Sequence, residues 1–144
     1  MIGKRKGSPK ARQMKKYVDF LKSHKDSSVS MLRSNYMLRS AIERNFQLAI
    51  ESALDVGEMI ISLENFKRPE DYRGVIEILG EEGIIPKDFA KRFASAAGVR
   101  NILVHMYAEV DLNELYNRLQ ELDDFDAYAI AIGKYLMRKE ASIT

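Results

Sequence analysis

The strongest hydrophobic pattern in this 144-residue chain runs from Asn35 to Leu63. Apolar residues recur there at alternating spacings of four and three positions, which is the period of one face of a helix. That stripe comprises Ile42, Phe46, Ala49, Ala53, Val56, Ile60 and Leu63, and a second stripe comprises Ile50, Leu54 and Ile61. Because the apolar arc is wide, we expect a long central helix of a bundle, or a helix that serves both a core and a dimer face.

The segment before this helix carries a weaker version of the same pattern. Residues 10–25 have apolar side chains at helical spacing and are predicted to form a helix. Residues 26–28, Asp-Ser-Ser, interrupt the pattern and supply capping side chains for whatever follows. Residues 29–34 are ambiguous, so the connection to the central helix is left open.

Two more helices are predicted after the central one. The tripeptide Pro-Glu-Asp at 69–71 should open a short helix with acids at its positive end, and Gly80 and Gly83 should end it. Pro86 should begin the next helix. That helix can continue through Gly98, because a glycine weakens a helix by only about 1 kcal/mol relative to alanine.

The C-terminal third reads as one further helical run. Asp111 and Glu114 have the spacing of an N-cap and an acid three residues on, a variant of the capping box. Apolar residues then recur at helical spacing to the end of the chain, at Leu112, Leu115, Leu119, Leu122, Phe125, Ala129, Ile132 and Leu136. Together these segments predict an all-α fold, a bundle of five to six helices with one long central helix.

The composition is that of a globular domain without covalent or metal cross-links. A chain of this length buries roughly 70% of its unfolded surface, enough for a core. The absence of cysteine excludes disulfides, thiolate nucleophiles and cysteine-based zinc sites. No apolar run reaches the roughly 18 residues of a membrane span, and no apolar stretch follows the basic N-terminus as in a secretory signal. We therefore expect a cytoplasmic protein.

Charge is unevenly distributed along the chain. Residues 1–16 hold seven basic side chains and no acidic one, whereas residues 17–144 hold 16 basic and 21 acidic side chains, a net charge of −5. We accordingly divide the chain into a basic N-terminal arm, residues 1–16, and a single helical domain, residues 17–144. The arm could contact phosphates, although a frayed and solvated terminus is more common. Met14 is a second candidate for the first residue.

One of the two histidines lies in the segment with the richest polar chemistry. Residues 98–107, Gly-Val-Arg-Asn-Ile-Leu-Val-His-Met-Tyr, place Arg100, Asn101, His105 and Tyr107 among apolar neighbours. On an ideal helix these four side chains span an arc of roughly 160°. Because imidazole titrates near neutral pH, His105 is the first candidate for acid–base chemistry. A single histidine beside an arginine is, however, often only a cap or a surface group.

These groups suit the cleavage of an RNA phosphodiester without a metal ion. A neutral imidazole can accept the proton of a 2′-hydroxyl, and a protonated one can give a proton to the leaving 5′-oxygen. Arg100 can pair with the phosphate and stabilise charge that develops in the transition state. Asn101 and Tyr107 can orient the phosphate. Since one histidine does not readily act as both acid and base, a two-fold dimer that joins two copies of the motif would supply the second.

The segment Arg-Asn-Ile-Leu-Val-His-Met-Tyr at 100–107 resembles the Arg-x4-His-x-Tyr signature of HEPN-domain proteins, specifically of the HepT-like branch. The resemblance extends to residues 43–51, Glu-Arg-Asn-Phe-Gln-Leu-Ala-Ile-Glu, and to the connections at 69–73 and 83–86. These segments follow one another in the family's order and together cover roughly residues 30–138. The basic arm has no counterpart in this resemblance.

The resemblance implies a homodimeric all-α ribonuclease toxin that needs no metal or cofactor, with the motifs of both protomers meeting at the dimer interface. Arg100 and His105 would take the catalytic positions, and Asn101 the polar position after the arginine. It also implies a partner, a minimal nucleotidyltransferase (MNT) antitoxin that transfers adenylate from ATP to the motif tyrosine, here Tyr107. A bulky anion beside Arg100 would exclude an RNA phosphate by charge and by volume.

Two alternatives remain open from the sequence. A non-catalytic helical protein could bind and regulate a nucleotidyltransferase, although such a scaffold has no need of an arginine and a histidine on one polar arc. A nucleotide-binding module is a weaker alternative, because no glycine-rich phosphate loop is present. On the long helix, Glu43, Glu51 and Asp55 are further candidates to face a cleft, although solvation or pairing with Arg44 is the more common role for such acids.

Overall fold

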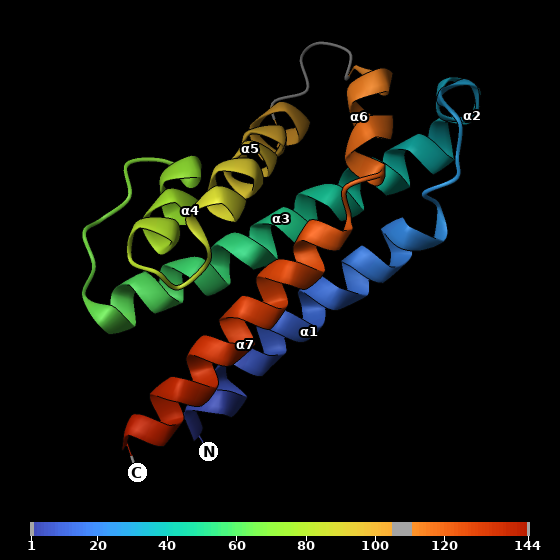
Figure 1. The fold of residues 1–144 in the computed structure, drawn as a ribbon. Coiled ribbons are helices and arrows are strands. Elements are labelled where there is room, and N and C mark those ends of the chain that lie inside the picture. The colour runs from blue at the N-terminus through green and yellow to red at the C-terminus, as the bar shows by residue number, and fades with distance from the viewer. Residues whose placement is uncertain (1, 105–110, 144) are drawn as a thin grey trace.

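The computed structural model describes residues 2–104 and 111–143, with side chains described for residues 9–100, 103 and 111–142. The described residues form seven helices, which confirms the all-α prediction: α1 (Ile2–Ser23), α2 (Val29–Ser34), α3 (Tyr36–Glu64), α4 (Tyr72–Glu81), α5 (Lys87–Val104), α6 (Leu112–Leu119) and α7 (Asp123–Ile143). Figure 1 shows α3 crossing the middle of the bundle, with α1 and α7 along one side and α4 and α5 along the other.

The long central helix is α3, and its ends are set by two asparagines. The Asn35 side chain caps the first turn by accepting a hydrogen bond from the Leu38 backbone N–H at 3.0 Å. At the other end Asn65 adopts a left-handed conformation, with φ of 58°, which stops the helix. Both predicted apolar stripes are buried except at Leu63, which is 60% exposed. The stripe prediction was wrong there: in the last turn of α3 the side chain of Leu63 faces solvent, whereas the adjacent Glu64 contacts Tyr135 and Lys139 of α7.

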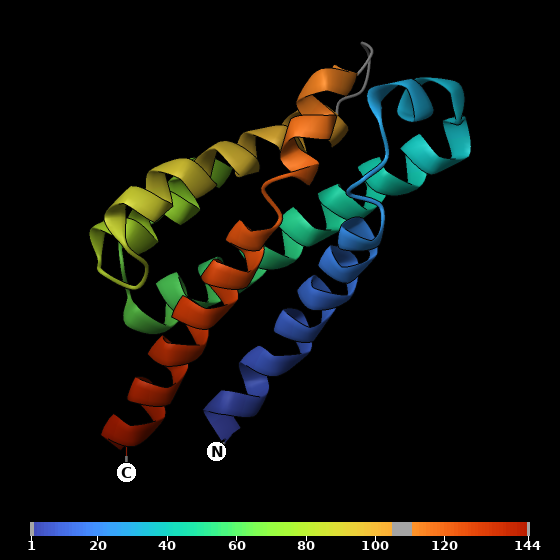
Figure 2. The same cartoon turned by 45° about the vertical axis from the view of Figure 1, so that its right-hand side comes forward.

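Helix α1 lies against α3 and α7, and Figures 1 and 2 both show the two chain termini at the same end of the bundle. Met14, Val18 and Leu21 are buried in the core. The helix begins at Ile2 and therefore crosses the boundary at residue 16 that the charge distribution suggested. The division into an arm and a domain stays a prediction.

The connections differ from the predictions in two places. The ambiguous residues 29–34 form the short helix α2, capped by the Ser28 side chain. Together with the break described next, this gives the described residues seven helices, one more than the six expected at most. The single C-terminal run is interrupted between α6 and α7. Backbone N–H groups of Gln120 and Glu121 bond to carbonyls three residues back there, which tightens the chain into a turn. The resulting bend lets both Leu119 and Leu122 reach the core.

Helices α3, α4 and α7 pack closely where they meet. A Cβ atom on Gly57 of α3 would lie 2.7 Å from Val75 Cγ1 and 3.1 Å from the Tyr128 hydroxyl oxygen. Tyr128 is buried and donates a hydrogen bond of 2.7 Å to the Ala53 carbonyl, so its one polar atom is satisfied. Glycine at position 57 thus allows the three helices to approach.

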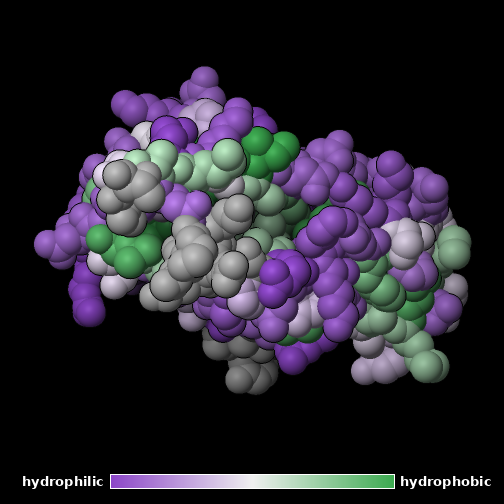
Figure 3. Space-filling view, turned by 90° about the horizontal axis from the view of Figure 1, so that it is seen from below, coloured by the Kyte–Doolittle hydropathy of each residue, from purple (hydrophilic) through white to green (hydrophobic). Residues whose placement is uncertain are grey.

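The face of the molecule seen in Figure 3 is mostly hydrophilic. At the end formed by α2 and the start of α3, by contrast, Met31, Tyr36 and Met37 are 49%, 70% and 81% exposed. None of the helices among the described residues is long and apolar enough to cross a membrane.

Candidate functional site

Arg100, the first residue of the predicted motif, lies one turn before the end of α5 and faces α3. Its Nε donates a hydrogen bond of 3.1 Å to the carboxylate of Glu51, in the middle of α3. The two side chains are only 19% and 31% exposed, so the contact is partly shielded from solvent. We call Arg100, Glu51 and their two neighbours described below, Gln47 and Tyr72, the arginine cluster.

The remaining members of the arginine cluster fix its geometry. Gln47, one turn before Glu51 on α3, donates a hydrogen bond of 3.2 Å to the same carboxylate oxygen. The Tyr72 ring, at the start of α4, lies under the guanidinium with 4.5 Å between the Arg100 Cζ and the ring centroid, a cation–π contact. The guanidinium is therefore held at its edge by a carboxylate and at its face by an aromatic ring.

This arrangement leaves one side of the guanidinium available. Glu51 engages Nε, and the two terminal nitrogens make no hydrogen bond to any residue that the structure describes. These nitrogens are the pair that can bind two oxygens of a phosphate end-on. The stack on Tyr72 limits rotation of the plane, so the fork is oriented before an anion arrives.

Of the three acids singled out on the long helix, Glu51 is the one that contacts Arg100, the motif residue whose side chain the structure describes. Asp55 lies one turn further along α3 and forms an exposed ion pair with Lys10, at 3.2 Å. Glu43 is buried and its closest ion-pair contact is Arg39, at 3.8 Å. Burial raises the pKa of the Glu43 carboxyl, an effect that Arg39 partly opposes. None of the three pairs with Arg44.

Sequence reasoning missed Tyr72 altogether. Nothing in its local sequence pattern distinguishes a ring that stacks on an arginine from one that fills a core. The start of α4 places it: Asp71 caps the helix by accepting a hydrogen bond from the Gly74 N–H at 2.8 Å, so the helix begins at Tyr72 rather than at Pro69.

The structure reaches only part of the motif. Asn101 lies in α5, but its side chain is outside the described residues, and so are His105 and Tyr107. The catalytic roles of Arg100 and His105, and the supporting roles of Asn101 and Tyr107, therefore stay predictions. Helix α5 does continue unbroken through Gly98, as expected.

Three comparisons with known proteins bear on the chain as a whole. The family model described as ribonuclease HepT-like matches residues 14–132. A tRNA nuclease HepT of Aphanizomenon flos-aquae is 31% identical over 127 residues, which is 87% of this chain and 86% of that protein. An mRNA nuclease HepT of Shewanella oneidensis is 24% identical over 100 residues, which is 69% of this chain and 75% of that protein.

Solved structures share the fold at lower identity. The tri-AMPylated HEPN toxin of Shewanella oneidensis, in complex with its MNT antitoxin, superposes with a TM-score of 0.78 at 22% identity, covering 86% of this chain and 93% of the toxin. YutE of Bacillus subtilis, a cytosolic protein of unknown function, superposes with a TM-score of 0.75 at 22% identity and 91% coverage of both chains. These likenesses show that the bundle is a known architecture.

Proposed function

This chain belongs to the HepT-like ribonuclease family, and from that premise we propose that it is a metal-independent RNA endonuclease and the toxin of a toxin–antitoxin pair. Arg100 and His105 are its catalytic residues in this proposal, and Asn101 and Tyr107 support them. Because its substrate is cellular RNA, we place it in the cytoplasm. We keep the division into basic residues 1–16, whose charges suit contacts with phosphates, and a helical domain of residues 17–144, although α1 runs through that boundary.

The proposed reaction is an internal transfer at phosphorus. Neutral His105 accepts the proton of the 2′-hydroxyl, and the 2′-oxygen attacks the adjacent phosphorus. The bond from phosphorus to the 5′-oxygen breaks, and a protonated histidine of the second protomer gives that oxygen a proton. The products are a 2′,3′-cyclic phosphate and a 5′-hydroxyl. Arg100 stabilises the charge on the non-bridging oxygens in the transition state.

The observation that carries this proposal is the orientation of Arg100. An exposed arginine that merely solvates a helix samples many rotamers, and holding it costs side-chain entropy. Here Glu51 and Tyr72 restrain the guanidinium, and among the described residues nothing forms a hydrogen bond with its terminal nitrogens. A site that is arranged before its substrate binds stabilises a transition state more effectively than one that must reorganise.

A homodimer completes the site in this proposal. The exposed apolar residues Met31, Tyr36 and Met37 support it, because they lie at the same end of the bundle as the C-terminal end of α5 (Figures 1 and 2). Exposed apolar side chains gathered at one end of a molecule are typical of surfaces that a partner covers. A second copy there would bring two motifs together.

We further propose that an MNT-type nucleotidyltransferase neutralises the protein by modifying Tyr107. The phenol oxygen would attack the α-phosphorus of ATP, the bond to the β-phosphate oxygen would break, and pyrophosphate would leave as the phenol loses its proton. The AMPylated toxin from Shewanella oneidensis supports this step by analogy. The added phosphate would then compete with RNA for Arg100.

The test compares wild-type protein with His105→Ala, each purified without a partner, on end-labelled RNA in excess EDTA. His24→Ala is the matched control, since His24 is the only other histidine in the chain and packs against Phe20 of α1. Mass spectrometry first establishes that Tyr107 is unmodified. We expect cleavage by the wild type and by His24→Ala, and none by His105→Ala.

If wild type and His105→Ala both fail to cut while both bind a nucleotidyltransferase, the protein is instead a regulatory partner of that enzyme. If both cut equally, His105 has no catalytic role. Circular dichroism of the three proteins excludes misfolding as the cause of a loss.

A further inference from the structure

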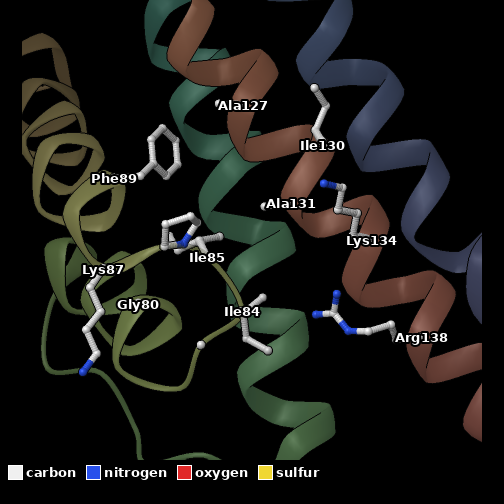
Figure 4. A pocket seen from close by; sticks show the side chains of 12 residues that line it. Gly80, Ile84, Ile85, Lys87, Phe89, Ala127, Ile130, Ala131, Lys134 and Arg138 are labelled. Atoms are coloured by element: carbon white, nitrogen blue, oxygen red, sulfur yellow. The ribbon is translucent and has the colours of Figure 1, made fainter.

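A cleft of about 620 Å³ lies between the α4–α5 connection and the middle of α7, and none of the residues of the arginine cluster lines it (Figure 4). Its volume falls within the range of roughly 300–1,000 Å³ that is typical of small-ligand sites. It is a single hollow rather than the extended surface of roughly 800 Å² that a stable protein–protein interface covers on each partner. The nuclease proposal makes no use of it.

The floor and one wall of this cleft are apolar. Ile84, Ile85 and Phe89, from the α4–α5 connection and the first turn of α5, face α7 across the gap (Figure 4). On α7 the residues opposite them are Ala127 and Ala131, whose methyl groups are too short to fill the space. Side chains in folded proteins normally interdigitate without such gaps, so the apolar surface here lacks a covering group.

The rim on α7 carries two cations that face this gap. Lys134 and Arg138 are one turn apart and both line the cleft; Figure 4 shows the Arg138 guanidinium extending from α7 toward Ile84, the Lys134 side chain running along α7, and the Lys87 ammonium turning away. Neither forms an ion pair with a residue that the structure describes, and the cleft is lined by no acidic side chain. Like charges one turn apart on a helix repel each other, so an anion placed between them would relieve that repulsion.

We propose that this cleft binds a small amphipathic carboxylate, with its acyl chain or ring on the apolar floor and its carboxylate between Lys134 and Arg138. The apolar floor accounts for one half of such a ligand, and the two cations, which have no ion-pair partner among the described residues, account for the other. A purely apolar ligand would leave the two charges uncompensated, and a small hydrophilic anion would leave Ile84 and Phe89 uncovered.

The probe is decanoate, titrated by calorimetry into the full-length protein below the concentration at which decanoate forms micelles. Decanol tests the apolar body without the charge, and acetate tests the charge without the body. We expect saturable one-to-one binding of decanoate, with an affinity at least about tenfold higher than that of decanol, because a charge-assisted pair contributes that much. Acetate should not bind measurably.

Two variants locate the site. Lys134→Gln/Arg138→Gln should weaken decanoate binding by about tenfold or more, whereas Lys16→Gln/Lys25→Gln, with the same change in net charge on exposed residues elsewhere, should leave it unchanged. Ala127→Phe is exposed enough to be tolerated by the fold and should block the cleft. Absence of saturable binding, equal binding of decanol, or binding that survives both Ala127→Phe and the double substitution would each overturn the proposal.

Discussion

Helix α3 has one place, Gly57, that serves the packing of the bundle and another, Glu51, that serves the proposed chemistry. At Gly57 the helix is so close to α4 and α7 that no side chain fits. Two turns earlier, at Glu51, it is far enough from α5 for a carboxylate, a guanidinium and a tyrosine ring to lie between the elements. Gly57 lets the three helices pack closely, and Glu51 orients the guanidinium of Arg100. We therefore expect substitutions at Gly57 to change stability, and those in the arginine cluster to change activity.

The largest effect should come from Arg100→Lys. Lysine keeps the charge but loses the planar fork, the hydrogen bond from Nε and the stack on Tyr72. Cleavage of RNA should fall about 100-fold or more, since removing one oriented donor to a transition state has an effect of that size. The measurement is the single-turnover rate, with Arg92→Lys on the same helix as the control, because Arg92 pairs with Asp124 away from the cluster. Equal losses in both variants would refute a special role for Arg100.

Gly57→Ala should lower the stability of the protein and leave its cleavage rate unchanged. The new methyl group would lie 2.7 Å from Val75 Cγ1, so Val75 or the helices must move. Overpacking of this kind costs about 1–3 kcal/mol, partly offset by the better helix propensity of alanine, about 1 kcal/mol. We expect a net loss of up to about 2 kcal/mol in the free energy of unfolding, measured by urea denaturation, and an unchanged cleavage rate for the folded protein.

The matched control for this prediction is Gly133→Ala. Gly133 is also in a helix, but a Cβ there would meet nothing within 4 Å. Stability should rise by up to about 1 kcal/mol, as helix propensity alone predicts. If the two alanine variants shift stability alike, close approach at Gly57 is not what the bundle depends on.

Glu51→Gln should have a smaller effect on catalysis. The amide keeps the shape of the carboxylate but not its charge, so Arg100 is held less firmly. We expect the cleavage rate to fall about tenfold, while the free energy of unfolding changes by less than about 1 kcal/mol because the ion pair is partly exposed. Asp55→Asn, one turn along α3 in an exposed pair with Lys10, should alter neither quantity. A faster Glu51→Gln enzyme would mean that Glu51 restrains Arg100 rather than orienting it.

Glu43→Gln should have the smallest effect, and it should depend on pH. Burial raises the pKa of Glu43 in the folded protein, so its contribution to stability is complete in acid and is lost as pH rises through that pKa. Glutamine cannot ionise, so the variant should be more stable than wild type at pH 7, by up to about 1 kcal/mol. The difference should vanish as pH falls below about 4, near the pKa of an unperturbed glutamate. A variant less stable at pH 7 would show that the pair with Arg39 outweighs burial.

The helices of the bundle could be predicted from the sequence more accurately than the side-chain contacts between them. Periodicity located α3 and its buried stripes, because burial along a regular helix repeats with the helix itself. It could not detect the break between α6 and α7, since Leu119 and Leu122 also fit a continuous helix. The motif identified Arg100, but the choice of Glu51 over Glu43 or Asp55 depends on how α5 is rotated against α3, and the stack on Tyr72 depends on where α4 begins. Both contacts depend on the tertiary arrangement of the helices, which a local sequence pattern does not specify.

The most direct test of the account is the chemistry of the cut RNA ends. Wild-type protein with unmodified Tyr107 is incubated with RNA in excess EDTA, and the product termini are identified by mass spectrometry. Attack by the 2′-hydroxyl, assisted by His105 and Arg100, predicts 2′,3′-cyclic phosphate and 5′-hydroxyl ends that form at the same rate with and without EDTA. Products with 3′-hydroxyl and 5′-phosphate ends, or cleavage that EDTA abolishes, would contradict it.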